Sequence, residues 1–235
     1  MATLLELQTA ILDISKNHYI QTESDVVLSS RINNAVNDIA GGIRMPNGEI
    51  SPPLPDLYKS AIVATSLTLP YVALPIDYMR NLFCVIDNSG NKIEPPRGGN
   101  YYSFMLFLKS IGSLDLSEKG SVYRACVKGS KLYYQGIPSV SVNLTVLYYR
   151  KPVAMSLETE TPDGIPEHLQ IRLIKHYVGH QLAREMVDGT DKMAAYHESE
   201  FYKAMIDLTD FIGITEAAPE YYGSDGLEDA GACDG

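Results

Sequence analysis

The sequence predicts an α+β protein in which helices from both ends of the chain form a bundle, with a long β-rich segment inserted between them. Apolar residues recur at helical spacing in two segments before residue 42 and in two after residue 163. Residues 58–150 instead consist of short runs rich in β-branched and aromatic residues, separated by turns. With 235 residues, of which 45% are hydrophobic, the chain is long enough to bury a substantial core.

Two helices are expected near the start of the chain, over residues 3–16 and 24–41, as the part of the bundle formed by residues 1–42. Ser24 is a suitable N-cap for the second helix, and Gly41-Gly42 is a stop signal. Each helix has one apolar face, formed by Leu4, Leu7, Ile11 and Ile14 in the first and by Leu28, Ile32, Ala35, Val36 and Ile39 in the second. The two helices should pack together through these faces.

Residues 43–57 are expected to form an exposed loop. Three of the four residues 52–55 are prolines, which remove backbone donors, and Asn47-Gly48 favours a turn. In a rigid assembly such a loop would reach a neighbouring molecule, although an idle loop in solvent is equally compatible with the sequence.

The middle of the chain, residues 58–150, is expected to form a β-rich insertion. Runs such as "LFCVID", "SVYRACV", "KLYYQ" and "SVSVNLTVLYY" are separated by the turn-forming letters "NSGN", "KGS" and "GIP". In the last run Val142, Leu144, Val146 and Tyr148 alternate with polar residues, as expected for a strand with one buried face. A helical piece over residues 101–111 interrupts these strands.

Residues 151–162 are expected to be a linker, after which residues 163–214 complete the helical bundle. Pro166 suits the first turn of a helix over residues 166–188, which Asp188-Gly189 would end. A second helix over residues 191–212 follows until Gly213. Because the connection is so short, the two helices should form an antiparallel hairpin.

The helix over residues 166–188 is apolar on two sides. One side carries Ile171, Ile174, Val178, Leu182 and Met186, and the opposite side carries Leu169, Leu173, His176, His180, Ala183 and Val187. A single hairpin partner covers one side, so the other side needs either the N-terminal helices or a second protein molecule. The second set is therefore predicted as a subunit or partner interface.

Three histidines of this hairpin raise the question of a metal site. His176 and His180 share a helix face, and His197 should lie within a turn of His180 on the next helix. Tyr177 stands where a metalloprotease has its glutamate base, and no Glu-x-x-His pattern of the di-iron kind occurs. The alternative is that these histidines are packing or interface residues. The sequence predicts no metal, cofactor or catalytic residue, and a metal-binding protein built on these histidines is the alternative hypothesis.

Charge and composition exclude several functions. The net charge is −10, and residues 215–235 form an acidic tail with six carboxylates and no lysine or arginine. An acidic protein repels DNA phosphates, which argues against sequence-specific nucleic-acid binding. Cys84, Cys126 and Cys233 are far apart and suit a reducing cytoplasm. The sequence predicts neither a membrane span nor an export signal.

Several stretches resemble one protein family. "VLSSRINNAVNDIAGGIRMPN" resembles the N-terminal part of the head-to-tail adaptor proteins of tailed bacteriophages. "LTVLYYRKPVAMSLETETPDGIPEHLQIRLIKHYVGHQLAREM" and the following "KMAAYHESEFYKAMIDLTDFIG" resemble their later part, and "YVALPIDYMRNLFCVID" is similar to a strand, a corner and another strand of these proteins. The resemblance covers most of residues 24–213.

The resemblance implies a structural protein of the virion neck and not an enzyme. Family members form a ring, commonly twelvefold, beneath the portal, and they provide the platform for the tail nozzle or tail tube. Tail fibres are further possible partners, and the genome passes through the ring during ejection without specific binding. Assembly in host cytoplasm and a place in the virion would follow.

The tail adds a further hypothesis. Its composition is that of a disordered terminus, and we expect Tyr221, Tyr222 and Leu227 to dock on the portal or on a neighbouring copy, with the carboxylates pairing to basic residues there. Besides the connector and the metal-binding protein, a third hypothesis is a β-rich module that recognises a protein or glycan through its tyrosines.

Overall fold

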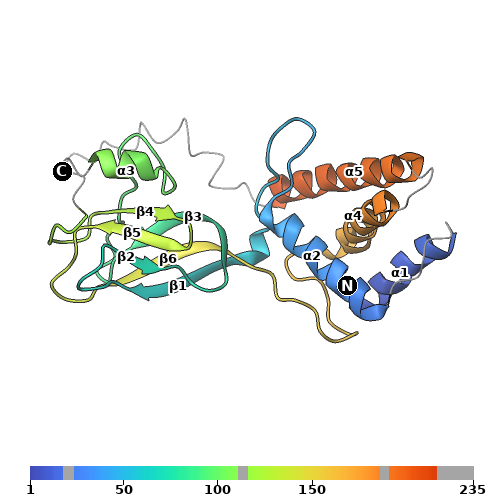
Figure 1. The fold of residues 1–235 in the computed structure, drawn as a ribbon, viewed down its shortest axis with the longest axis horizontal. Helices are drawn as coiled ribbons and strands as arrows, with labels where there is room; N and C mark the ends of the chain where they lie inside the picture. Colours follow the sequence, from blue (N-terminus) through green and yellow to red (C-terminus); the bar gives the residue numbers. More distant parts are fainter. Residues whose placement is uncertain (18–23, 111–115, 186–190, 216–235) are drawn as a thin grey trace. The chain divides into compact units, whose positions relative to one another are not determined.

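The structure, a computed structural model, describes residues 1–17, 24–110, 116–185 and 191–215. It has the mixed α+β fold that the sequence predicts, with helices near both ends of the described chain and antiparallel strands between them (Figure 1). The chain divides into two compact units. A helical unit consists of the described parts of Met1–Leu57 and Pro152–Gly235, and a β-rich unit consists of the described parts of Tyr58–Lys151.

The helical unit contains every helix that the hydrophobic periodicity predicts. These are α1 (Leu4–Asn17), α2 (Asp25–Gly41), α4 (Gln170–Glu185) and α5 (Asp191–Thr215). A 3-10 turn, η2 (Glu167–Leu169), precedes α4, so the predicted start at Pro166 is the entry to this turn and not to the α-helix itself. A second 3-10 turn, η1 (Pro55–Leu57), ends the first part of the unit.

Helix α4 is the centre of the helical unit. It forms an antiparallel pair with α5, as the contacts of Arg172 with Asp207 and of His176 with His197 show, and it also packs against α1 and α2 (Figure 1). Its fully buried side chains meet a core to which the other three helices contribute. The buried apolar residues of the four helices include Leu7, Ile11, Leu28, Ile32, Ile39, Leu173, Ile174, Val178, Leu182, Phe201, Ala204, Met205 and Leu208.

This packing buries part of the predicted subunit interface within a single copy. Leu169, Leu173 and Ala183 retain 4%, 0% and 0% of their surface exposure within a single copy. The N-terminal helices cover the side of α4 that α5 leaves open, which is the first of the two coverings that the sequence allowed. His176 and His180 are partly buried in the same packing. Val187, the last residue of that prediction, lies outside the described residues.

A buried glutamine fastens the start of α4 to the N-terminus. The side-chain oxygen of Gln170 accepts a hydrogen bond of 2.8 Å from the backbone N–H of Ala2, and its side-chain nitrogen donates one of 2.9 Å to the carbonyl of Ile165. Gln170 is only 3% exposed, so these bonds satisfy a polar group that would otherwise be costly to bury. The first and second chain segments of the helical unit are thereby joined by polar contacts as well as by apolar packing.

The loop over residues 43–57 is only partly exposed, which corrects the prediction for its second half. A small turn at Asn47-Gly48 is closed by a β-bridge between Arg44 and Ile50, and Gly48 has a φ of 90°, which explains the glycine. Beyond it, Ser51 and Leu54 are buried at 3% and 1% exposure. The prolines therefore lie in an irregular segment that is anchored in the helical unit.

The expected linker is likewise anchored. The Asn33 side chain of α2 donates to the carbonyl of Met155 and accepts from its N–H, at 2.9 and 2.8 Å. Met155 and Ile165 are buried at 5% and 3% exposure. The chain that enters α4 thus runs along α2 and contributes to the same core.

The β-rich unit consists of two three-stranded antiparallel sheets. One has the order β1-β6-β3, from Tyr58–Ala64, Asn143–Arg150 and Tyr78–Ile86, and the other has the order β2-β5-β4, from Tyr71–Ala73, Lys131–Gln135 and Arg124–Lys128. Helix α3 (Phe104–Ser110) is shorter than the helical piece predicted over residues 101–111. Leu144, Val146 and Tyr148 of β6 are fully buried, as their alternation predicts, whereas Val142, the first residue of that predicted alternation, precedes the strand and is only partly buried.

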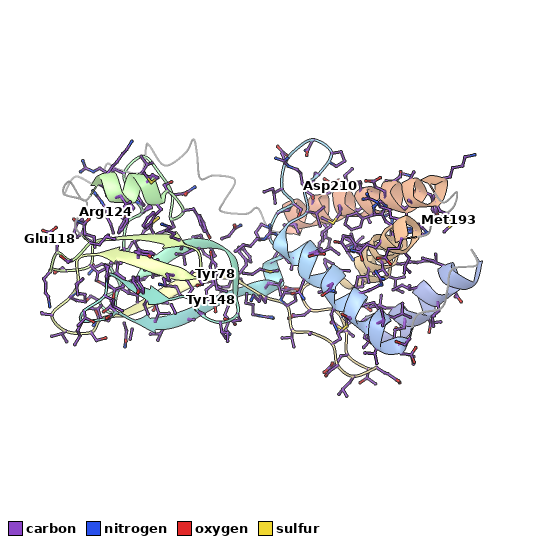
Figure 2. All side chains as sticks on the ribbon, in the orientation of Figure 1. Tyr78, Glu118, Arg124, Tyr148, Met193 and Asp210 are labelled. Atoms are coloured by element: carbon purple, nitrogen blue, oxygen red, sulfur yellow. The ribbon has the colours of Figure 1, made fainter. Side chains whose placement is uncertain are left out.

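The corner between β2 and β3 is held by a network that joins Asp77 to the buried Tyr148 and to the exposed Lys59. Asp77 accepts hydrogen bonds of 2.6 Å from the ammonium group of Lys59 and from the hydroxyl of Tyr148. Burial alone would raise the pKa of Asp77, but these two hydrogen bonds outweigh it and hold that pKa below its ordinary value. The ring of Tyr78 packs beside that of Tyr148, with centroids 5.6 Å apart (Figure 2).

The burial of α4 predicts that substitutions at its buried and at its exposed positions have different effects on stability. Leu173→Ala should lower the free energy of unfolding by about 2–5 kcal/mol, because it leaves a cavity in the core. Ile171→Ala, on the same helix but 44% exposed, should cost much less. Chemical denaturation at several protein concentrations measures both, and a Leu173 effect that appears only in an associated form would restore this residue to a subunit interface.

Candidate functional site

The three predicted histidines lie together, but they are used in helix packing. The Nδ1 atoms of His176 and His197 are 2.9 Å apart, and the Nδ1–H of His180 donates to the backbone carbonyl of Ala194 at 3.1 Å. Gly179 of α4 lies directly beneath the ring of His197, where a Cβ atom would be 3.0 Å from that ring. The pair of helices is therefore as close here as the imidazole allows.

Each of the three histidines uses its Nδ1 atom in one of these contacts. A hydrogen bond at Nδ1 fixes the tautomer and orientation of an imidazole and is compatible with a metal ligand at Nε2. Within the described ranges, no group of three or more histidine, cysteine or acidic side chains is placed to hold an ion. The alternative interpretation, packing histidines bonded to their neighbours, accounts for the contacts.

The His176–His197 contact also limits how the pair titrates. Two Nδ1 atoms at this distance share one proton, so one of the two rings must stay neutral while the contact persists. Burial lowers the pKa of His176, and the nearby positive charges of Lys175 and Arg172 act in the same direction, whereas Glu200 opposes them. The folded helical unit therefore favours the neutral imidazole.

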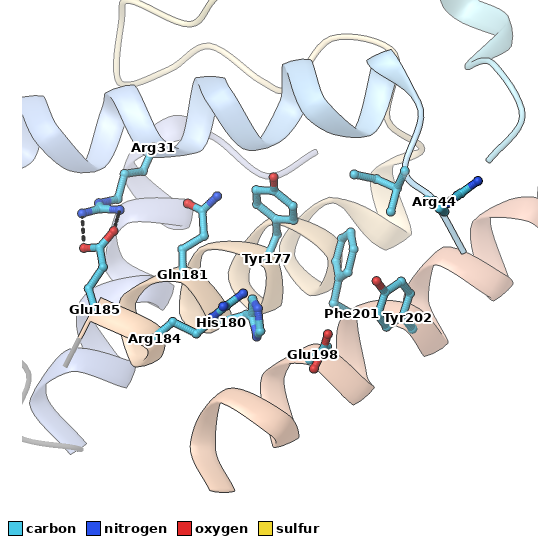
Figure 3. Close-up of a pocket in the computed structure, with 11 residues that line it drawn as sticks. Arg31, Arg44, Tyr177, His180, Gln181, Arg184, Glu185, Glu198, Phe201 and Tyr202 are labelled. Carbon is cyan, nitrogen blue, oxygen red and sulfur yellow. Dashed lines mark hydrogen bonds and ion pairs between the residues drawn. The ribbon is translucent and has the colours of Figure 1, made fainter. Parts of the chain in front are cut away.

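A larger feature of the helical unit is a groove of about 750 Å³, which we call the arginine groove (Figure 3). Helices α2, α4 and α5 and the start of the loop after α2 supply its walls. It is lined by Arg31, Ile43, Arg44, Tyr177, His180, Gln181, Arg184, Glu185, Glu198, Phe201 and Tyr202.

One end of the arginine groove is closed by an ion pair. Both guanidinium nitrogens of Arg31 on α2 contact the carboxylate of Glu185 on α4, at 2.9 and 2.6 Å. The hydrogen bond from Arg31 holds the pKa of Glu185 below its ordinary value. Figure 3 shows this pair at one end of the groove and Arg44 with Tyr202 at the other.

The floor of the groove is aromatic. The hydroxyl of Tyr177 donates to Asp38 on α2 at 2.5 Å, and its ring meets that of Phe201 edge to face, with centroids 5.2 Å apart. Phe201 is almost entirely buried, whereas Tyr177 and Tyr202 remain partly exposed. In chemical terms the groove offers guanidinium groups and tyrosine rings, a combination suited to binding carboxylates and aromatic side chains.

Sequence reasoning missed this groove. Arg31, Arg44 and Arg184 come from segments up to about 150 residues apart, and no local pattern relates them. The only available signal was that Arg31 lies outside the apolar face of its predicted helix, on the side that carries Asn34 and Asp38.

The tyrosines of the β-rich unit are divided between its core and its surface. Tyr134 and Tyr148 are fully buried, which leaves them unavailable for recognition. Tyr58, Phe83 and Tyr149 form a cluster on the β1-β6-β3 sheet, with ring centroids 5.5 and 5.8 Å apart along the cluster, and Tyr58 is 48% exposed. This cluster is one aromatic surface of the β-rich unit, and Tyr102 and Tyr123 are also exposed.

The predicted docking residues Tyr221, Tyr222 and Leu227 lie outside the described residues. Among the helices that the structure does describe, none is long and apolar enough to cross a membrane.

The close approach of α4 and α5 predicts opposite effects for two Gly→Ala changes. Gly213→Ala on α5, where a Cβ atom meets nothing within 4 Å, should raise the free energy of unfolding by up to about 1 kcal/mol through helix propensity. Gly179→Ala gains the same propensity but must displace the buried His197 ring, so it should be net destabilising, by about 1–2 kcal/mol. Thermal unfolding followed by circular dichroism measures both changes, and equal stabilisation would show that the helices are not this close.

The buried imidazole predicts a loss of stability in mild acid. Because the pKa of His176 lies below its unfolded value of 6.5, the unfolded chain takes up the proton more readily as the pH falls through that value. The melting temperature should therefore be lower at about pH 5.5 than at about pH 7.5. Both pH values lie above the range in which most carboxylates titrate, so the difference reports on histidine. His176→Asn, which keeps a nitrogen but does not titrate, should reduce this difference, and a wild-type melting temperature that is constant over the range would contradict the assignment.

Comparison with known proteins supplies the context for these surfaces. A family model described as the SU10 adaptor protein matches residues 2–222, nearly the whole chain. Comparison with curated proteins gives no match. The family match agrees with the resemblance to phage head-to-tail adaptors carried by residues 24–213, and it includes both the helical and the β-rich unit. The chain belongs to the SU10 adaptor protein family.

Proposed function

We propose that this phage structural adaptor forms an oligomeric ring, twelvefold in symmetry, that joins the portal to the tail and surrounds the DNA exit channel. The observation that carries the proposal is the family match over residues 2–222. Its partners are further copies of itself, the portal protein and a tail nozzle or tail tube protein, with tail fibres as an additional contact. The protein acts in the virion neck by assembly and not by catalysis.

Charge supports the part of the proposal that concerns DNA. A protein with a net charge of −10 does not attract phosphates at long range, which suits a channel through which the genome must slide during ejection.

The burial of α4 within one copy limits which surfaces can form the contacts between subunits of the ring. Since Leu169, Leu173 and Ala183 are covered within one copy, subunit contacts have to come from side chains that the single copy leaves exposed. On the helical unit these include Val26, Ile171 and Ile206, at 79%, 44% and 49% exposure. Heterologous contacts between such patches close a ring when the rotation between copies permits it.

The proposal keeps the acidic tail as a docking element. Tyr221, Tyr222 and Leu227 would bind the portal or a neighbouring copy, with the six carboxylates supplying charge complementarity to a basic surface. The aromatic cluster of Tyr58, Phe83 and Tyr149 offers a contact for a tail component on the β-rich unit.

The test is the mass of the assembly. Native mass spectrometry and negative-stain electron microscopy should show rings, either of the purified chain alone or after its cognate portal protein is added. The same measurements with and without a chelator should be identical. A chain that stays monomeric in the presence of the portal, or that carries stoichiometric metal, would contradict the proposal. Ile206→Asp should impair assembly while leaving the fold intact by circular dichroism, because this side chain is exposed.

A further inference from the structure

The arginine groove carries excess positive charge in a chain that is otherwise acidic. Three guanidinium groups line it against two carboxylates, and one of those carboxylates, that of Glu185, is already paired with Arg31. Arg44 and Arg184 form no ion pair with any residue in the described part of the chain. The groove therefore presents two arginines and the partly exposed rings of Tyr177 and Tyr202 to an occupant.

The C-terminal sequence of the same chain has the complementary composition. Residues 216–235 contain six carboxylates and neither lysine nor arginine, and they include the pair Tyr221-Tyr222. Arginine binds carboxylates through two parallel hydrogen bonds, and aromatic rings pack against both tyrosine and guanidinium faces. Each chemical feature of the groove thus has a counterpart in this segment.

The segment also has the length to reach the groove of its own copy. Helix α5 runs past Tyr202 and ends at Thr215, thirteen residues later, which at a rise of about 1.5 Å per residue is a distance of about 20 Å. An extended chain covers about 3.3 Å per residue, so residues 216–221 span about 20 Å and can return to the level of Tyr202. Tyr202 and Arg44 lie at the end of the groove nearer the C-terminus of α5 (Figure 3).

We propose that the arginine groove is the docking site for the C-terminal segment of the same chain, residues 216–229. Tyr221 and Tyr222 pack beside Tyr202 at the entrance, and the carboxylates of Asp225, Glu228 and Asp229 extend along the groove towards Arg184. Because the segment is tethered, its effective concentration at the groove is high and modest contacts are sufficient. The inference deepens the proposed function, since the segment is then held by its own copy until a portal or neighbouring subunit competes for it.

Site-specific photo-crosslinking in the full chain tests this proposal. Tyr221 is replaced by the photoreactive residue p-benzoylphenylalanine, and the products are identified by mass spectrometry after irradiation of the dilute monomer. Cross-links within one copy should join the segment to peptides that contain Tyr177–Arg184 or Glu198–Tyr202. Raising the salt to about 0.5 M should reduce their yield, because exposed charge pairs are screened.

Two matched double variants separate the groove from general charge. Arg44→Gln with Arg184→Gln should lower the cross-link yield several-fold, whereas Arg97→Gln with Lys151→Gln, which removes the same charge from exposed positions of the β-rich unit, should leave it unchanged. Arg44→Lys with Arg184→Lys should restore part of the yield. Thermal unfolding of each variant checks that the fold is kept.

Three outcomes would overturn the proposal. These are cross-links confined to the β-rich unit, cross-links found only between two copies, and equal yields from the two double variants. The measurement uses the isolated chain and does not depend on ring formation, so a negative result here leaves the ring proposal standing, and the absence of rings leaves this result standing.

Discussion

The structure of the helical unit depends on one constraint, which is that α4 is apolar on two opposite sides. Leu173 and Val178 are completely buried, and a single neighbouring helix does not bury both sides of a helix. The chain therefore has to bring α1 and α2 from its N-terminal part to the hairpin of α4 and α5. The β-rich unit is compatible with this because its first and last strands are neighbours, with Tyr58 paired to Tyr149, so the two ends of its chain lie side by side.

The same constraint accounts for the histidines. Where α4 and α5 approach most closely, Gly179 provides the space and His197 fills it, and His176 satisfies the polar edge of that ring. Burial disfavours the charged form of His176 and lowers its pKa, so this imidazole contributes to stability as a neutral group. Helical spacing of histidines is compatible both with metal binding and with helix packing, and the described contacts of these three rings are contacts between helices.

Periodicity was sufficient to predict the helices, their hairpin and the β-rich insertion, because each of these is a local pattern of apolar residues. It was not sufficient to identify what covers each face. Leu173 and Ala183 have the same sequence signature whether an N-terminal helix or a second subunit packs on them, and only the tertiary structure distinguishes the two. The arginine groove was missed for a related reason, since Arg31 and Arg184 become neighbours only after folding. The network around Asp77 likewise forms only after folding, because Lys59 is on β1, Tyr148 is on β6 and Asp77 lies in the corner before β3.

Burial of α4 within one copy has a consequence for assembly. A protomer that left one flank of this helix in water would expose a large apolar surface and would associate as soon as it was made. With α1 and α2 on that flank, the core face of α4 is covered within the folded protomer, and exposed apolar residues such as Val26 and Ile206 lie outside that core. Contacts between such surfaces resemble those of proteins that fold first and associate afterwards. In the proposed ring, such contacts would gain most when a partner with its own symmetry aligned the copies, so the proposal favours assembly on a portal over spontaneous closure in solution.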